Sequence, residues 1–188
     1  MHPPSLEADK QALVARLKDA REALLTLVRS LPADQVEAPG AMGDWSVKDI
    51  IGHIASWEDR LLTMTQMVLN GQADKIDWID SDEALQAWNH RQQRRKQGWS
   101  WSDTIRELAL LREEVLWNVD GIEPAQLFQP HDLAAGRVSP AELLEGIAAH
   151  DQEHLVELRT WAEGSLEELG GTLGGSRRNS EELSEGLG

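Results

Sequence analysis

The sequence predicts an all-α fold: an antiparallel four-helix bundle with one short extra helix. Long segments repeat apolar residues at intervals of three and four, capping signals begin them, and no convincing strand pattern appears. The 188 residues suffice for one core without disulfides, and cysteine is absent. We therefore expect a single domain over residues 1–164. The remainder, 165–188, is rich in Gly, Ser and Glu and is expected to be a flexible, disordered tail.

The first two expected helices are separated by a connector that contains proline and glycine. The first helix spans residues 6–31, and Pro32 stops it. Ser46 caps the second helix, with Asp49 at the position that completes a capping box. The Asn-Gly pair at residues 70–71 ends this helix.

Two more helices follow an irregular segment over residues 71–81. A short, highly charged helix is expected over residues 82–96, before Gly98. Ser102 is expected to open the next long helix, whose apolar stripe faces the core.

The last helix has the clearest start signal and an unusual buried face. Ser139 is the expected N-cap and Glu142 closes its capping box, while Gly164 is the expected end. Two histidines, His150 and His154, lie one turn apart on the stripe that should carry apolar side chains. At this spacing both imidazoles share one helix face, so they can bind a single cation.

A third histidine, His53, interrupts the inward stripe of the second helix in the same way. Bundle-core metal sites are commonly built from inward residues on facing helices. Three imidazoles also leave a coordination position for water or substrate, as catalytic sites do. The sequence therefore predicts a divalent metal site formed by His53, His150 and His154. The alternative is that each histidine only hydrogen-bonds to a neighbour in the core.

Further residues can be assigned to the surroundings of this site. Glu157 follows His154 by three residues, shares its helix face and is the first candidate for proton transfer. Asp151 is expected to lie on a solvated helix face. Trp45 and Trp57 flank His53 and are predicted to wall a substrate pocket, with core packing as the alternative.

The charge and the absence of apolar runs exclude several classes of partner. The formal net charge of -15 opposes non-specific nucleic-acid binding. No run approaches the roughly 20 apolar residues that span a membrane, and the N-terminus lacks the features of a signal peptide. We therefore expect a cytoplasmic protein with a small-molecule substrate, no nucleic acid and no membrane contact.

One dense basic cluster stands out on the charged helix, and His90 beside it is expected at the surface. Its members are Arg91, Arg94, Arg95 and Lys96. Such a cluster is ordinarily a solvated helix face. The alternative is that it receives an anionic thiol cofactor or an acidic partner subunit.

Several of these motifs resemble those of a known superfamily. Residues 44–58, Asp-Trp-Ser-Val-Lys-Asp followed by His53, resemble the second-helix signature of the DinB superfamily, and residues 150–154 resemble its last-helix signature. Residues 83–89 and 110–116 are similar to the ClbS/DfsB family within it. The resemblance covers about residues 6–163.

The resemblance implies a DinB/YfiT-like four-helix bundle, often a homodimer, with a divalent ion, zinc or nickel, on the three histidines. Members include thiol-dependent transferases that use a low-molecular-weight thiol, and metal-dependent hydrolases. We therefore expect an enzyme in which the ion activates water or a thiol against an electrophilic substrate, in detoxification or self-resistance. The alternatives are a protein that sequesters a ligand without turnover and a metal-independent, ClbS-like cyclopropane hydrolase.

Overall fold

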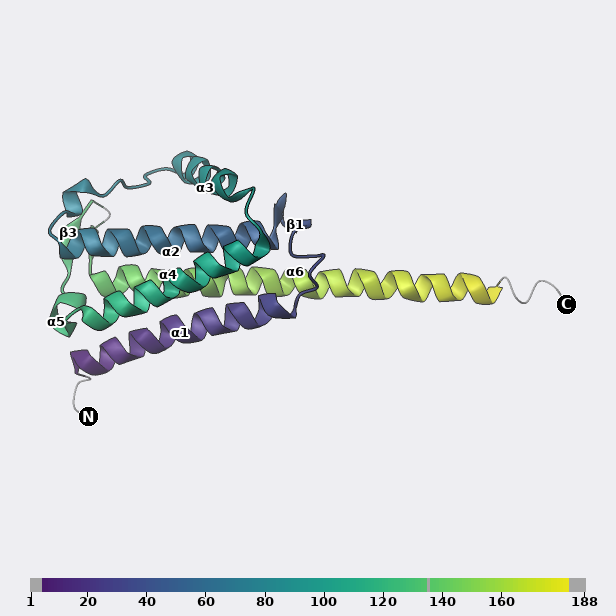
Figure 1. Ribbon diagram of the computed structural model, residues 1–188, viewed down its shortest axis with the longest axis horizontal. Coiled ribbons are helices and arrows are strands. Elements are labelled where there is room, and N and C mark those ends of the chain that lie inside the picture. Colours follow the sequence, from purple (N-terminus) through teal and green to yellow (C-terminus); the bar gives the residue numbers. More distant parts are fainter. Residues whose placement is uncertain (1–4, 135, 183–188) are drawn as a thin grey trace.

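Four long helices build the bundle, and a fifth, shorter helix lies across its outside (Figure 1). The computed structural model describes residues 5–134 and 136–182, and side-chain surroundings as far as residue 164. The elements in chain order are α1 (Leu6–Ser30), β1 (Pro39–Met42), β2 (Trp45–Ser46), α2 (Val47–Leu69), the 3-10 turn η1 (Ala73–Lys75), α3 (Asp82–Lys96), α4 (Trp101–Gly121), α5 (Pro124–Leu127), β3 (His131–Leu133), β4 (Gly136–Val138) and α6 (Pro140–Glu182). The predicted all-α bundle with a short extra helix is confirmed.

The bundle helices run in two opposed pairs. In Figure 1, α1 and α6 run in one direction, and α2 and α4 run in the other. The segment through η1 and α3 passes over the outside of α2 and returns the chain to the end at which α2 began. As a result α6 packs antiparallel against α2, while α1 packs parallel to α6 and α2 packs parallel to α4.

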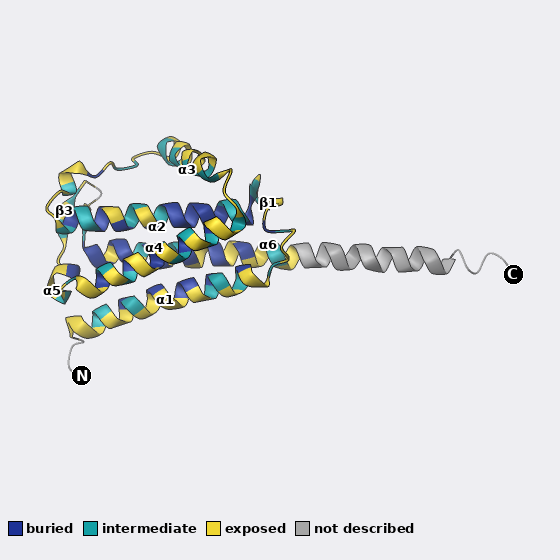
Figure 2. Ribbon diagram, in the orientation of Figure 1, coloured by how far each residue is buried: buried dark blue, intermediate teal, exposed yellow. Residues whose placement is uncertain are grey.

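The core is the shared inward face of these four helices, which Figure 2 shows as dark stripes along each ribbon. Its largest fully buried apolar side chains are Leu13, Leu17, Leu24, Ile50, Ile51, Ile54, Leu108, Leu127, Leu144, Ile147 and Leu158. Burying one such side chain contributes about 1.5–3 kcal/mol. In contrast, α3 has no buried residue, so it covers the bundle without belonging to its core.

Capping signals set where the site-bearing helices begin. Ser46 caps α2: its Oγ accepts from the backbone N–H of Asp49, and the Asp49 carboxylate accepts from the backbone N–H of Ser46. Ser139 and Glu142 form the same reciprocal box ahead of α6. Both predicted capping boxes are confirmed. For α4 the cap is Ser100, not the expected Ser102.

Loss of the Ser46 cap should lower stability measurably. Ser46→Ala is expected to reduce the free energy of unfolding by about 1 kcal/mol, because it leaves an N-terminal N–H of α2 without its acceptor. Ser81→Ala is the matched control, because the Ser81 side chain also accepts from a backbone N–H in the first turn of its helix, α3. Since α3 lies outside the core, loss of its cap should lower the free energy of global unfolding in urea by less than loss of the Ser46 cap does. Equal losses in the two variants would contradict this.

The connectors contain short strands that the sequence pattern did not predict. β1 pairs with β2, and β3 with β4, each as a two-stranded antiparallel hairpin. The turn of the first hairpin includes Gly43 at φ +58°, a conformation that favours glycine. Strands this short carry too few residues for an alternating pattern to stand out.

The last helix continues where the sequence predicted its end. α6 passes through Gly164 to Glu182. A glycine inside a helix costs only about 1 kcal/mol, and the next five residues, 165–169, include leucine and glutamate, which are good helix formers. The side chains beyond residue 164 lie outside the described residues, and the flexibility expected of the tail stays a prediction. Over the part of the chain that is described, no helix is long and apolar enough to cross a membrane.

Candidate metal centre

Three imidazoles from two antiparallel helices converge at one point of the bundle. His53 comes from α2, and His150 and His154 come from successive turns of α6. The ring centroid of His53 lies 5.0 Å from that of His150 and 5.1 Å from that of His154, and the latter two are 4.5 Å apart. One ring nitrogen from each of the three lies within 4.8 Å of the others.

The two α6 histidines face each other through equivalent atoms. Nε2 of His154 lies 3.0 Å from Nε2 of His150. Two neutral lone pairs at this distance would repel, so a proton or a cation must lie between them. The i, i+4 spacing therefore brings the two ring nitrogens that could bind a cation close together, and not only the two residues.

Burial keeps two of the rings neutral at physiological pH. Desolvation, with a smaller effect of the neighbouring imidazoles, lowers the pKa of His53 from 6.5 to about 3. Desolvation, followed by His154, lowers the pKa of His150 to about 4. Neutral imidazole is the form that binds a metal. Nδ1 of His53 is also the one buried side-chain nitrogen or oxygen without a hydrogen-bond partner among the described residues.

A carboxylate fixes the tautomer of His154. Oε2 of Glu157 lies 2.7 Å from Nδ1 of His154. A carboxylate accepts, so Nδ1 of His154 donates, and in the neutral ring Nε2 then carries the lone pair that faces His150. Glu157 thus reaches the site from the half-exposed rim of the pocket.

The histidines form one side of a pocket of about 540 Å³ between α2, α3 and α6. Trp45 packs edge-on against His53 at 5.4 Å, and Trp57 lies 6.4 Å from the same ring. Asn89 of α3 accepts a hydrogen bond from the indole N–H of Trp57. The complete lining is Met42, Trp45, His53, Trp57, Leu85, Gln86, Asn89, His90, His150, Glu153, His154 and Glu157. Both predicted wall tryptophans therefore lie beside the histidines.

Asp151 corrects one expectation from the sequence. It was expected on a solvated face, but it is fully buried and bonded to two arginines. Arg21 Nε and Arg112 Nη2 lie 3.0 and 2.9 Å from its Oδ2, and Glu58 bridges the same two arginines at 2.5 and 2.6 Å. We call these four residues the buried charge network.

The buried charge network takes one residue from each bundle helix. Arg21 belongs to α1, Glu58 to α2, Arg112 to α4 and Asp151 to α6. Burial alone would lower the pKa of Arg21, but the two carboxylates outweigh it and raise that pKa above its ordinary value. The arginines also donate to the backbone carbonyls of Leu108 and Leu17. The sequence carried a signal for this network, because each of its members interrupts an apolar stripe.

Of the other residues singled out in the sequence, His90 lies at the rim of the histidine pocket and the basic cluster lies outside it. Arg91 and Arg94 are exposed, as expected of a solvated face. Arg95 and Lys96, from the same cluster, line a different pocket on the other side of α3. His90 is exposed, but it lines the rim of the histidine pocket and faces Trp45 at 6.4 Å.

Comparisons with solved structures find the same fold in proteins of very different sequence. An uncharacterised protein from Escherichia coli UTI89 matches with a TM-score of 0.70 at 13% identity, over 83% of this chain and 94% of that one. The colibactin self-resistance protein ClbS, solved in complex with double-stranded DNA, gives 0.68 at 11%, over 81% and 94%. DfsB, a sibling lethal factor precursor, gives 0.67 at 15%, over 83% and 96%.

Sequence comparison decides the family. A search of curated proteins found no significant match. The DinB superfamily, however, matches residues 16–158, which include the whole histidine cluster and the buried charge network. ClbS and DfsB have the same fold as this chain, in agreement with the resemblance seen in the sequence. The chain belongs to the DinB superfamily.

Proposed function

We propose that this protein is a metal-dependent enzyme acting on a small electrophilic molecule, with a divalent ion held by His53, His150 and His154. The observation that carries the proposal is the convergence of three imidazole nitrogens within 4.8 Å at the wall of a pocket. Three protein nitrogens leave coordination positions for a further ligand, which is the pattern of catalytic sites.

The residues present fit such an ion. Two of the rings are neutral at pH 7, and one buried ring nitrogen, Nδ1 of His53, has no partner within the described chain. Imidazole nitrogen is a good ligand for zinc and for nickel, so the donor set suits both ions. A bound ion would supply Lewis acidity, which lowers the pKa of water or of a thiol enough to make it a nucleophile at neutral pH.

The chain's own residues would orient the site and hold the substrate. The Glu157 carboxylate accepts a hydrogen bond from Nδ1–H of His154 and keeps that ring turned toward His150. Its carboxylate lies at the pocket rim, so we propose that it also takes up a proton from the nucleophile. Trp45 and Trp57 provide apolar walls that exclude water from an electrophile beside His53. ClbS is a self-resistance protein, which makes detoxification the broader role that we propose here.

The test pairs metal analysis with a substrate panel. Purified, tag-free protein should carry close to one transition ion per chain, and the triple variant His53→Ala/His150→Ala/His154→Ala should carry none. The panel would contain reactive cyclopropanes, epoxides and thiol acceptors, each with and without a low-molecular-weight thiol. Turnover by the wild type and not by the triple variant is the expected result.

Glu157→Gln separates proton transfer from metal binding. Glutamine can still accept the hydrogen bond from Nδ1 of His154 but cannot take up a proton. Turnover should fall by about 100-fold, within the usual range for a general base, while the ion stays bound. Glu153→Gln is the matched control, because Glu153 lines the same pocket without a bond to a histidine among the described residues. Its turnover should stay within about twofold, as expected of an exposed charge.

The same assays identify the alternatives. Turnover that persists in the triple variant would reject metal catalysis and favour a ClbS-like pocket that works without a metal. Tight retention of a ligand without turnover of any compound would instead favour sequestration. Comparison of turnover with and without a low-molecular-weight thiol shows whether the thiol takes part.

A further inference from the structure

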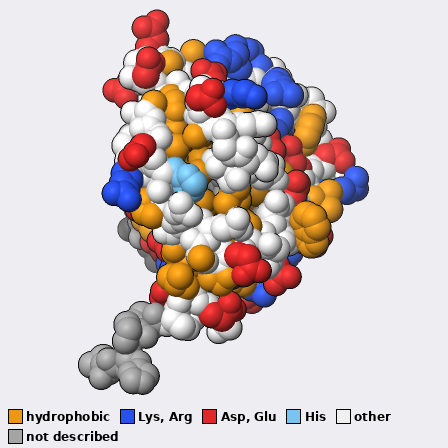
Figure 3. Space-filling model, turned by 90° about the vertical axis from the view of Figure 1, so that its left-hand side faces the viewer, with side chains coloured by type: hydrophobic (Ala, Val, Ile, Leu, Met, Phe, Trp, Pro, Cys, Tyr) orange, Lys and Arg blue, Asp and Glu red, His pale blue; other side chains and the backbone are white. Residues whose placement is uncertain are grey.

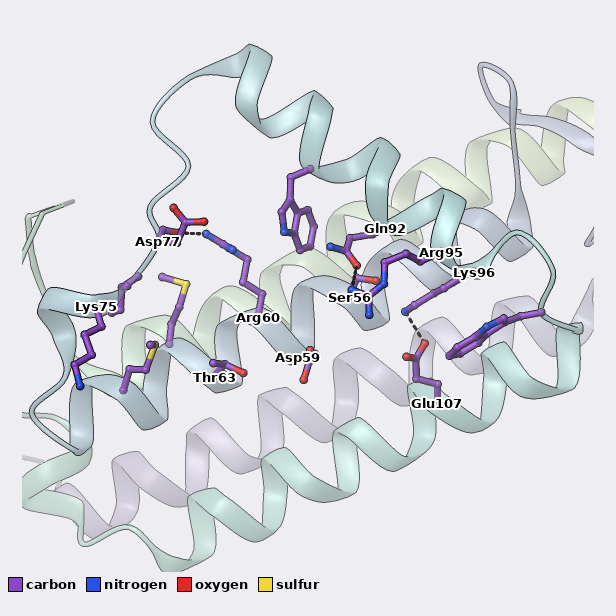
Figure 4. A pocket seen from close by; sticks show the side chains of 15 residues that line it. Ser56, Asp59, Arg60, Thr63, Lys75, Asp77, Gln92, Arg95, Lys96 and Glu107 are labelled. Carbon is purple, nitrogen blue, oxygen red and sulfur yellow. Dashed lines mark hydrogen bonds and ion pairs between the residues drawn. The ribbon is translucent and has the colours of Figure 1, made fainter.

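A second pocket lies on the other side of α3 from the histidines. It has a volume of about 490 Å³, in the range of small-molecule sites. It opens between α2, η1, α3 and the start of α4 (Figure 4). We call it the α2–α3 pocket. The proposed metal chemistry uses none of its residues.

Four cationic side chains belong to the α2–α3 pocket. Arg60, Lys75, Arg95 and Lys96 all line it. Figure 4 shows the guanidinium groups of Arg60 and Arg95 and the ammonium group of Lys96 in the space between α2 and α3. Toward the edge of the molecule where α3 lies, Figure 3 shows lysine and arginine side chains gathered on the surface. This region is therefore locally basic on a chain of net charge -15.

Not all of these cations are available to a ligand. Nζ of Lys96 lies 2.5 Å from Glu107 Oε2 and also donates to the carbonyl of Gly52, so its charge is compensated. Arg60 donates one hydrogen bond to the backbone carbonyl of Asp77, and Arg95 donates one to the side chain of Gln92. A guanidinium group has five N–H donors, so both arginines keep donors for a further acceptor.

Aromatic and apolar groups adjoin these donors. The Arg60 guanidinium lies over the Trp88 ring, 5.5 Å from its centre, and Met64, Met67 and Ile76 provide apolar surface in the same pocket. An indole and an arginine in contact are suited to a flat apolar group that carries a negative charge.

The lining charge favours an anion, although three carboxylates also face the pocket. Of Asp59, Asp77 and Glu107, the last is neutralised by Lys96. Arg60, Lys75 and Arg95 then outnumber the two remaining aspartates. The histidine pocket differs, because its charged lining residues are Glu153 and Glu157 and it has no lysine or arginine. The two pockets are therefore suited to ligands of different charge.

We propose that the α2–α3 pocket binds a small aromatic anion, a carboxylate or a phosphate ester, with its ring against Trp88 and its charge on Arg95 and Arg60. The site adjoins the histidine pocket through one pair of indoles. Trp88 packs against Trp57 at 4.6 Å, and Trp57 lines the histidine pocket. A ligand on Trp88 is thus one ring removed from the histidine site, and it is bound by residues that do not depend on the metal.

The test measures binding of 2-naphthoate to the full chain by isothermal titration calorimetry, after removal of metal with a chelator. Chelation prevents the carboxylate from binding to an ion on the histidines. We expect a Kd below about 1 mM. The affinity for neutral 2-naphthalenemethanol should be about tenfold lower, because charge-assisted hydrogen bonds to arginine are lost. Cationic 2-naphthylmethylamine should bind more weakly still.

Variants locate the site. Arg95→Gln should weaken naphthoate binding by about tenfold and leave the alcohol unaffected, since it removes only a charge-assisted contact. Trp88→Leu should weaken both compounds. Arg91→Gln is the matched control, with the same charge change on the same helix but outside the pocket, and it should stay within about twofold because only long-range, screened charge is lost.

Three results would overturn the proposal. An equal loss in Arg91→Gln would mean that naphthoate responds only to the general charge of α3. Preference for the amine would mean that the carboxylates dominate the pocket. Unchanged affinity in both Arg95→Gln and Trp88→Leu would place any binding elsewhere. None of these results bears on the metal proposal, because the protein is metal-free throughout.

Discussion

Asp151→Asn is expected to lower the free energy of unfolding by about 3–5 kcal/mol. Asparagine keeps the shape of the side chain but removes its charge. Arg21 and Arg112 would then share the single carboxylate of Glu58, which leaves a net positive charge in the core. An uncompensated buried charge costs far more than the intact network contributes, because water cannot solvate it.

Urea unfolding of chelated protein measures this loss without interference from metal binding. Glu145→Gln is the matched control, because it also removes one carboxylate of an ion pair between α1 and α6. That pair, with Arg16, is about half exposed on both sides, so its loss should cost no more than about 1 kcal/mol. If Asp151→Asn costs no more than Glu145→Gln, the buried charge network does not hold the helices as its geometry indicates.

The network also explains how the histidine helices are held in place. Glu58 follows His53 by five residues on α2, and Asp151 directly follows His150 on α6. The same two arginines bind both carboxylates. The relative positions of α2 and α6 at the site are therefore set by ion pairs through α1 and α4, which do not themselves line the histidine pocket.

The helices could be predicted from sequence because their signals are local. Apolar spacing gave the inward faces, and the Ser46 and Ser139 capping boxes gave two helix starts correctly. The continuation of α6 beyond Gly164 could not be predicted in this way, because one glycine weakens a helix without ending it. The opposed pairing of the helices is a property of the long crossover through α3, and helix spacing alone does not determine it.

The histidine cluster was found from the sequence, but the role of Asp151 was missed. The sequence predicts His150 and His154 on the inward stripe of α6. In the structure Asp151 occupies the centre of that stripe, among the buried Leu144, Ala148, Leu155 and Leu158, and the histidines lie toward the side that faces α2 and α3. From a single sequence, an aspartate at such a position is interpreted as solvent-exposed unless its arginine partners on the other helices are recognised. Those partners are separated from it by 130 and 39 residues.

His53→Ala is expected to weaken binding of zinc or nickel by at least about 100-fold, more than the 10–100-fold typical when an outer partner of a metal ligand is lost. His53 is the only member of the cluster on α2. Without it, His150 and His154 remain as an i, i+4 pair on one helix, with no ligand from the facing helix. Competition titration against a chromophoric chelator gives the affinity, and circular dichroism checks that the helix content is unchanged.

His90→Ala is the matched control for this variant. His90 is an exposed histidine at the rim of the same pocket, but it is outside the cluster, so its removal should change the affinity by no more than about twofold. Metal-linked stability provides a second readout, because an ion at 100 times its Kd stabilises the native state by about 2.7 kcal/mol. That stabilisation should persist in His90→Ala and fall to about 0.4 kcal/mol or less in His53→Ala at the same ion concentration. If His53→Ala keeps its affinity while His150→Ala loses it, His53 belongs to the pocket wall, and the ion would rest on the α6 pair alone.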